Sequence, residues 1–571
     1  MTNDPRLMPL AQKRLILLGA LVSLFLAALD QTIVSTATPA IVRDLAFPTS
    51  WITWLTTAFL VMSTATLPIW GKLSDLYGRK NILITGLLLF CFASVLCALA
   101  FSPLSMVLFR ALQGIGSAAI FSTVFALVSD IFTPQERPRY QGLFGSVFAV
   151  SSVVGPWVGG MLTDMVSWHW VFLVNVPILA MVLPFILKKM PPLRHRNSGS
   201  IDFAGAVMLL ATVIPLLLIF AVAPARYAWI SAPVLSMAMI VILAFIAFMV
   251  HERRVGEPII DLGLFADKSF LLMALGAFFT GGAFLCAIVF IPLYMVNVYD
   301  FSATRAGVTV MPLTFGLVSA NIASGRLASH IGSYKPVLVP ALIFAVAALL
   351  TCSMTLNVGQ SQWSISIRLF LVGVGLGPSI PMLTQMMINS VTRQKIGMVS
   401  STAAFVRQLG NTVGLAVFGT ILTAILTAGM SIGGASVMTQ TDKGHLSLET
   451  GVSVTSHFDA DKMIATAKSR YARLSSRIQN RQTLTTEDLQ LLGLELDALA
   501  TMDAAALNAQ VHLRQKQTET RIFEFAQTFK ATWTKAVKTI FMTAMAMVLC
   551  GLVSVVLIPE IPFKELERRH G

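Results

Sequence analysis

Two ionisable residues lie deep inside apolar stretches of the chain, where a charged side chain is costly. Asp30 lies about sixteen residues into the apolar run 15–37, and Arg110 lies within the run 104–129. Desolvation favours the neutral form of a carboxylic acid, so Asp30 is a candidate for taking up and releasing protons. The guanidinium of Arg110 stays charged and would favour the ionised form of a nearby carboxylate. A change in the distance between these two groups would therefore drive proton release.

Both residues also have a structural interpretation. Asp30 could bond to neighbouring hydroxyl or backbone groups only to fix helix packing, and Arg110 could form a structural ion pair or bind backbone carbonyls. We favour proton coupling, because few other acids lie this deep in apolar segments. Six polar residues in the same runs are candidates for lining a substrate cavity, or for hydrogen bonds between helices: Gln31, Thr32, Gln113, Asn175, Gln408 and Asn411.

A charged, glycine-containing loop separates the apolar runs 51–70 and 81–101. Its sequence is Gly71-Lys-Leu-Ser-Asp75-Leu-Tyr-Gly78-Arg79-Lys80. Small residues let helix ends approach closely, and an acid among bases suits a latch that can be made and broken. We expect Arg79 to pair with Asp130. We also expect Asp75 to lie against a helix that begins near 397–400, because a helix N-terminus favours an anion.

The run 142–164 contains Gly155-Pro156-Trp-Val-Gly159-Gly160. Proline removes one helical hydrogen bond, and the glycines let a neighbouring helix approach and pivot. Ordinary packing of small residues is the alternative interpretation.

The composition indicates a membrane protein that must position these residues on helices. Apolar residues make up 56% of the chain and charged residues only 12%, against about 25% in ordinary soluble domains. Runs of about 18 or more apolar residues are candidate spans. We count fourteen: 15–37, 51–70, 81–101, 104–129, 142–164, 170–188, 203–223, 229–250, 269–297, 304–327, 336–356, 365–391, 398–428 and 533–557.

The net charge of +14 does not indicate a nucleic-acid partner, because the cations are concentrated in alternate loops. With both termini in the cytoplasm, the inner loops are rich in Lys and Arg and the short outer loops are poor in them. Compact loops without N-x-[ST] acceptors suggest a bacterial cell (inner) membrane. The five cysteines have no metal spacing, and no G-x-x-x-x-G-K-[ST] motif is present, so we expect no metal, no cofactor and no ATP-driven step.

The polar segments divide the chain into parts. We predict a six-helix half over 1–188, a linker and two inserted helices over 189–268, and a second six-helix half over 269–571, interrupted by an outer segment at 430–532. This segment carries eleven basic and eleven acidic residues, and helices are expected near 459–481, 485–499 and 504–530, the last running into the final span. It is either a loop cover without a partner or a docking site for a periplasmic adaptor protein.

These motifs together resemble the major facilitator superfamily of secondary transporters. G-x-L-x-D-x-x-G-R-K at 71–80 is similar to the loop between helices 2 and 3 of that family, and l-x-x-R-x-x-Q-G-x-G-x-A around Arg110 is similar to its helix 4 motif. The Gly-Pro-x-x-Gly-Gly core resembles the helix 5 signature of exporting members, with Ser151 where glycine is usual. Fourteen spans with an inserted pair resemble the drug:proton antiporter branch.

The resemblance implies an all-α major facilitator fold and a proton-driven exporter of amphipathic compounds, cations among them, that works by alternating access. The implied partners are protons, a small-molecule substrate and membrane lipid. A dedicated exporter of a lipid, siderophore or amino acid is an alternative within transport. A non-transporting membrane sensor would have no need of Asp30, Arg110 and the helix 5 signature together. A membrane enzyme would need a polar catalytic cluster at one interface, and none is visible.

Overall fold

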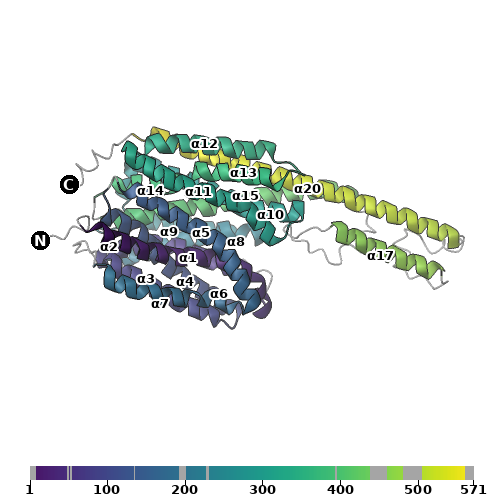
Figure 1. The fold of residues 1–571 in the computed structure, drawn as a ribbon, viewed down its shortest axis with the longest axis horizontal. Helices are drawn as coiled ribbons and strands as arrows, with labels where there is room; N and C mark the ends of the chain where they lie inside the picture. The colour runs from purple at the N-terminus through teal and green to yellow at the C-terminus, as the bar shows by residue number, and fades with distance from the viewer. Residues whose placement is uncertain are drawn as a thin grey trace.

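The computed structural model describes residues 8–47, 51, 54–133, 136–191, 201–226, 231–392, 395–437, 460–479 and 504–559. Every regular element in these ranges is a helix (Figure 1). The elements are α1 (Leu10–Asp44), α2 (Trp54–Tyr77), α3 (Arg79–Ala98), α4 (Pro103–Ile131), α5 (Arg137–Met165), α6 (His169–Leu173), α7 (Asn175–Lys189), α8 (Phe203–Arg226), α9 (Ala232–Glu252), η3 (Leu262–Ala266), α10 (Lys268–Tyr299), α11 (Ala303–Ile331), α12 (Lys335–Thr355), α13 (Gln362–Leu376), α14 (Ser379–Asn389), α15 (Ile396–Val437), α17 (Ala460–Gln479) and α20 (Ala504–Leu557).

Twelve segments of the described chain are long and apolar enough to cross a membrane. Helices α2 and α5 are not among them, although they are 24 and 29 residues long. Both pack inside the bundle, α2 mainly against α4 and α5 mainly against α1. The fourteen expected spans therefore correspond to these twelve segments together with α2 and α5.

Two of the expected spans are each divided into two helices. The run 170–188 contains α6 and α7, which meet at Val174, and the run 365–391 contains α13 and α14, separated by Gly377-Pro378. Pro378 has no N–H to continue the hydrogen-bond pattern of α13, so the helix ends there. Proline is tolerated in the first turn of a helix, which is where Pro177 lies in α7.

The helices form two groups that lie side by side along the long axis of the molecule (Figure 1). Helices α1 to α7 pack around one set of buried apolar side chains, and α10 to α15 with α20 pack around another. Helices α8 and α9 pack on each other, and α8 also contacts α2 and α15. Small residues allow close crossings: a Cβ atom on Gly114 of α4 would lie 2.4 Å from the carbonyl oxygen of Phe59 in α2.

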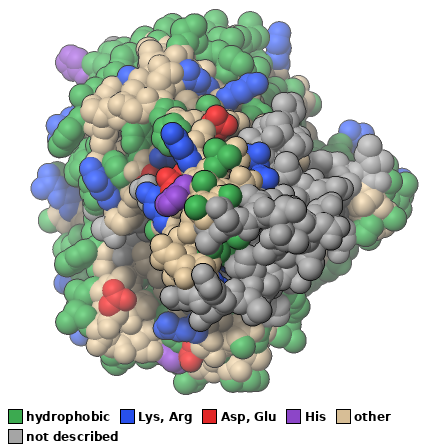
Figure 2. Space-filling view, turned by 90° about the vertical axis from the view of Figure 1, so that its right-hand side faces the viewer, with side chains coloured by type: hydrophobic (Ala, Val, Ile, Leu, Met, Phe, Trp, Pro, Cys, Tyr) green, Lys and Arg blue, Asp and Glu red, His purple; other side chains and the backbone are tan. Residues whose placement is uncertain are grey.

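One end of the bundle carries a projection made by α17 and the first part of α20 (Figure 1). The 54 residues of α20 make a helix about 80 Å long at 1.5 Å per residue, well beyond a bilayer core of about 30 Å. Helix α17 packs on it through an apolar cluster of Tyr471, Leu474, Ile478, Leu507 and Val511. Seen from this end, Lys and Arg side chains lie among acidic and hydrophobic ones on the end face (Figure 2).

The projection includes two of the three helices that the sequence predicts for the outer segment. Helix α17 covers the run expected over 459–481, and α20 continues without a break from the outer segment into the last span. The amphipathic helix expected over 485–499 lies outside the described residues, as does most of the basic linker between the first half and the inserted pair.

Candidate functional site

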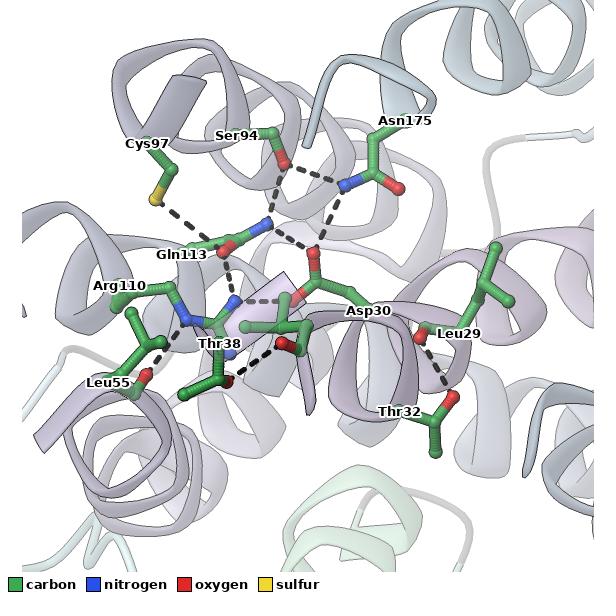
Figure 3. Close-up of polar contacts among 11 residues, drawn as sticks. Leu29, Asp30, Thr32, Thr38, Leu55, Ser94, Cys97, Arg110, Gln113 and Asn175 are labelled. Atoms are coloured by element: carbon green, nitrogen blue, oxygen red, sulfur yellow. Dashed lines mark hydrogen bonds and ion pairs between the residues drawn. The ribbon is translucent and has the colours of Figure 1, made fainter. Parts of the chain in front are cut away.

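Asp30 of α1 and Arg110 of α4 form an ion pair inside the first group of helices. Nη1 of Arg110 lies 2.6 Å from Oδ2 of Asp30, and the two side chains are 1% and 0% exposed. The same nitrogen donates to Oε1 of Gln113 at 2.6 Å, and Nε donates to the carbonyl of Leu55 at 3.1 Å (Figure 3). The rings of Phe59 and Phe172 lie 4.4 and 5.8 Å from the guanidinium carbon, within cation–π distance.

The second oxygen of the Asp30 carboxylate accepts two amide hydrogen bonds. Nε2 of Gln113 donates to Oδ1 at 2.8 Å, and Nδ2 of Asn175 donates to it at 3.2 Å. Both amides also donate to Oγ of Ser94 in α3, at 2.6 and 3.0 Å (Figure 3). Three donors from α4 and α7 therefore converge on one carboxylate, so that both of its oxygens accept hydrogen bonds.

Each member of this buried ion pair depends on the charge of the other. A proton on Asp30 removes the negative charge that Arg110 faces, and an unpaired buried guanidinium is costly. Loss of either charge would therefore leave the other uncompensated inside the bundle. Arg110 lies seven residues from the start of α4, or about 10 Å along its axis, so the pair is close to the end of the bundle that carries the projection.

The other predicted cavity residues do not join this network. Thr32 donates to the carbonyl of Ser151 at 2.9 Å, in the contact between α1 and α5, and to the carbonyl of Leu29. Gln31 is partly buried. Gln408 and Asn411 lie on α15, where Nδ2 of Asn411 donates to Oε1 of Gln408 at 3.2 Å. The structure thus brings Gln113 and Asn175 to Asp30, and keeps the α15 pair in the other group of helices.

The latch loop, residues 71–80, forms a buried charge cluster at the opposite end of the bundle. Nη2 of Arg79 lies 2.6 Å from Oδ1 of Asp75, and Nε lies 2.7 Å from Oδ2 of Asp130. A third nitrogen, Nη1, donates to Oγ of Ser74 at 2.6 Å. Arg79 is fully buried, and two carboxylates compensate its charge. The contact expected between Arg79 and Asp130 is therefore present.

Asp75 also connects the two groups of helices. Its carboxylate accepts the backbone N–H groups of Gly397 at 3.0 Å and Met398 at 2.7 Å, at the start of α15. This is the helix N-terminal contact expected for Asp75, and it satisfies two N–H groups that the helix leaves free. Gly71 permits the close approach, because a Cβ atom there would lie 1.9 Å from Oγ of Ser401.

The two remaining loop residues act within the first group of helices. Gly78 has a φ of +90° between α2 and α3, a backbone conformation that favours glycine. Nζ of Lys80 donates to the carbonyl of Leu187 in α7 at 2.7 Å. Within the described part of the chain, the side chain of Lys80 therefore makes no hydrogen bond or ion pair to the second group of helices, unlike Asp75.

Several contacts at the latch end were not predicted from the sequence. Arg137, which counts among the loop cations in the sequence, is 1% exposed and donates from Nη1 to Oδ1 of Asn389 in α14 at 2.5 Å. Nearby, Gln385 donates to Ser129. Glu257 and Asp261 follow α9 and pair with Lys72 and Lys395 respectively. No motif marks these residues, since their partners are distant in the sequence.

The glycines of α5 pack directly on α1. A Cβ atom on Gly155 would lie 2.1 Å from Oγ1 of Thr32, and one on Gly159 would lie 2.4 Å from Oγ1 of Thr36. Gly160 differs, because nothing lies within 4 Å of its Cβ position. The backbone of α5 is helical through Pro156, whose side chain is outside the described part. Two of the three glycines are thus required for the α1–α5 contact.

Comparison with known proteins identifies the family. Residues 20–415 match the sequence model of the Major Facilitator Superfamily. This chain belongs to the major facilitator superfamily. It is therefore a membrane-spanning transporter rather than an enzyme, and its substrates are small molecules. The match ends before α17 and α20, so the projection lies outside it.

Curated relatives from bacteria and fungi are named for multidrug resistance, multidrug transport or efflux. Multidrug resistance protein 3 of Bacillus subtilis (strain 168) is 34% identical over 417 residues, covering 73% of this chain and 81% of that protein. Multidrug transporter protein MdtP of the same organism is 32% identical over 414 residues, covering 72% and 76%. Efflux pump dotC of Dothistroma septosporum is 29% identical over 405 residues, covering 70% and 68%.

Solved structures with low sequence identity share the fold. The proton:xylose symporter XylE, bound to 6-bromo-6-deoxy-D-glucose, is 12% identical with a TM-score of 0.53, covering 73% of this chain and 90% of that one. A bacterial homologue of the human lysosomal transporter Spinster is 15% identical with a TM-score of 0.51, covering 96% and 98%. The all-helical major facilitator fold expected from the sequence is confirmed.

Proposed function

We propose that this chain is a proton-driven exporter of amphipathic compounds, of the fourteen-helix drug:proton antiporter branch, that works by alternating access. The observation that carries the proposal is the ion pair between Asp30 and Arg110. A carboxylate with 0% exposure, held by a guanidinium and two amides, changes its charge and its partners when it binds a proton. The relatives named as multidrug transporters and efflux pumps support the direction of transport.

The latch end is assigned to the cytoplasm. Support comes from the excess of Lys and Arg in the loops at this end, and α1 begins and α20 ends there (Figure 1). In this orientation both termini are cytoplasmic, the membrane is the inner membrane of a bacterium, and the projection lies outside it. The contacts of Asp75 with α15 and of Arg137 with Asn389 then hold the cytoplasmic side closed.

The transport cycle follows from these two sites. A proton from outside binds the Asp30 carboxylate and breaks its pair with Arg110, and substrate leaves outward. The latch contacts of Asp75 and Arg79 then open, and the site faces the cytoplasm. Arg110 reforms its pair as the proton leaves to the cytoplasm, and a new substrate molecule enters. Each cycle moves protons inward and substrate outward.

The projection of α17 and α20 would be the contact surface for a periplasmic adaptor protein. It extends the outer end of the bundle by a helix pair with its own small apolar core. This role is independent of proton coupling, so the transport cycle does not depend on it.

The proposal is tested by dye transport into inverted membrane vesicles. With an acidic vesicle interior, the native protein should accumulate the amphipathic dye Hoechst 33342 and acidify the external medium more than protein-free vesicles do, because protons leave the interior as dye enters. Nigericin, which collapses the pH gradient, should abolish the accumulation. Accumulation that continues without a pH gradient would contradict proton-driven export.

A further inference from the structure

Arg407 of α15 is a cation inside the bundle that no ion pair compensates. No hydrogen bond or ion pair of its side chain to another described residue is present, and its Nε is buried without a hydrogen-bond partner. It lies eleven residues after the start of α15, or about 16 Å along the axis, close to half the thickness of a bilayer core. This depth is beyond the reach of lipid headgroups.

The orientation of Arg407 follows from the contacts of the residues around it on α15. Ser401 meets Gly71 of α2, in the first group of helices, whereas Gly410 meets Phe278 of α10. At 100° per residue, Arg407 lies between these two directions, nearer to α10. A Cβ atom on Gly281 of α10 would lie 3.0 Å from Cγ of Arg407. Arg407 is only partly buried, so part of its side chain is accessible where the two groups of helices face each other.

Two amide side chains on the same helix extend this polar surface. Gln408 and Asn411 are linked by one hydrogen bond of 3.2 Å. Asn411 is only 7% exposed, and its Oδ1 is buried with no hydrogen-bond partner among the described residues. A buried polar atom without a partner costs free energy, which a bound ligand can recover. Arg407 thus offers a donor that no described residue uses, whereas Oδ1 of Asn411 is an unused acceptor, which a donor group such as the ammonium of a zwitterion can satisfy.

Charge accounting of the described spans favours an anion at this surface. Asp30 pairs with Arg110, and Asp75 and Asp130 both pair with Arg79, so each of these three carboxylates already has a cationic partner other than Arg407. No carboxylate in the described part of the chain pairs with Arg407, so the region between the two groups has excess positive charge. A cationic ligand would be repelled there, whereas a carboxylate can accept parallel hydrogen bonds from a guanidinium.

We infer that Arg407, which lies beside Gln408 and Asn411, binds an anionic group of the transported compound, so that the substrates include amphipathic carboxylates or zwitterions. This inference rests on the proposed export function and narrows its substrate class. Arg407 is a specificity-determining residue in this account, separate from the coupling pair. It acts on substrate charge, and Asp30 acts on the proton.

Binding of two ligands of similar shape and opposite charge tests the inference without a proton gradient. The full chain in lipid nanodiscs is dialysed against 2-naphthoate or 2-naphthylmethylammonium. The native protein should bind the naphthoate more tightly than the ammonium compound. Arg407→Gln should weaken naphthoate binding at least tenfold without weakening binding of the ammonium compound. Arg407→Lys, which keeps the charge, should weaken naphthoate binding less. Arg305→Gln, at an exposed arginine of the outer end, is the control and should bind both ligands as the native protein does.

A second measurement uses only the native protein and does not depend on folding of the variants. Phenylglyoxal modifies accessible arginines, and 2-naphthoate should slow the modification of Arg407, but not of Arg305, when both are quantified by mass spectrometry. Absence of protection, or naphthoate affinity that is unchanged in Arg407→Gln, would overturn the inference. An equal loss of affinity for both ligands in Arg407→Gln would assign Arg407 a structural role instead. Failure of proton coupling alone would leave these binding results unaffected.

Discussion

Arg110 and Asp130 lie on the same helix, α4, separated by 20 residues, which places them about 30 Å apart along one axis. Arg110 pairs with Asp30 near one end of the bundle, and Asp130 pairs with Arg79 at the other. A single helix therefore carries one member of each of these two buried ion pairs. In the proposed cycle, movement of α4 when the first pair breaks would be transmitted along this helix to the second pair at the latch.

The buried pair predicts unequal effects of single and double substitutions on stability. Arg110→Gln leaves the Asp30 carboxylate buried without its cation, and loss of one partner of such a pair costs about 3–5 kcal/mol. The melting temperature of the purified protein should fall markedly. The double variant with Asp30→Asn should recover part of the loss, because no buried charge is left unpaired. A double variant that is as unstable as the sum of both single variants would contradict this account.

The latch predicts a change in accessibility at the start of α15. Asp75→Asn removes the charge that accepts the N–H groups of Gly397 and Met398, so the closed arrangement should be populated less. A single cysteine at Ser401, which is 0% exposed, should react several-fold faster with a maleimide in this variant, in a background that lacks the five native cysteines.

Lys80→Gln is the matched control for the latch experiment, because Lys80 binds a carbonyl within the first group of helices. It should leave the reaction rate of the cysteine at position 401 unchanged. Equal acceleration by both variants would indicate a general loosening of the loop rather than release of the Asp75 contact.

The contact of α5 with α1 predicts opposite outcomes for two adjacent glycines. Gly159→Ala places a methyl group against Thr36 Oγ1 and the carbonyl of Ile33, which lie 2.4 and 2.5 Å from the Cβ position. The helices must separate, so dye transport should fall at least tenfold. Gly160→Ala meets open space and should keep native transport. Similar rates of dye transport in the two variants would contradict the packing role of Gly159.

Much of the fold was predictable because membrane spans need long apolar runs, and the latch contacts of Asp75 and Arg79 follow from a charged motif at a known kind of turn. The network around Asp30 was predictable only in part. Gln113 shares a helix face with Arg110, but Ser94 is one small polar residue within an apolar run, and its bonds to Gln113 and Asn175 depend on three-dimensional packing.

The same limit applies to Arg137 and to the division of α13 from α14. Arg137 belongs to a basic loop by sequence, yet its burial results from its bond to Asn389, 252 residues away. A pattern of hydropathy along the chain contains no information about such a pair. The break at Gly377-Pro378 has a local cause, but the apolar run continues across it, so hydropathy alone predicts a single helix.

In the proposed cycle, protonation of Asp30 couples the pH gradient to substrate export. The most direct test compares Asp30→Asn with the native protein in proteoliposomes, by measuring transport driven by a pH gradient and substrate exchange without one. Asp164→Asn, at an exposed acid near the end of α5, is the control and should behave as native. We predict that Asp30→Asn loses gradient-driven transport and keeps exchange. Gradient-driven transport at the native rate in Asp30→Asn would contradict the account.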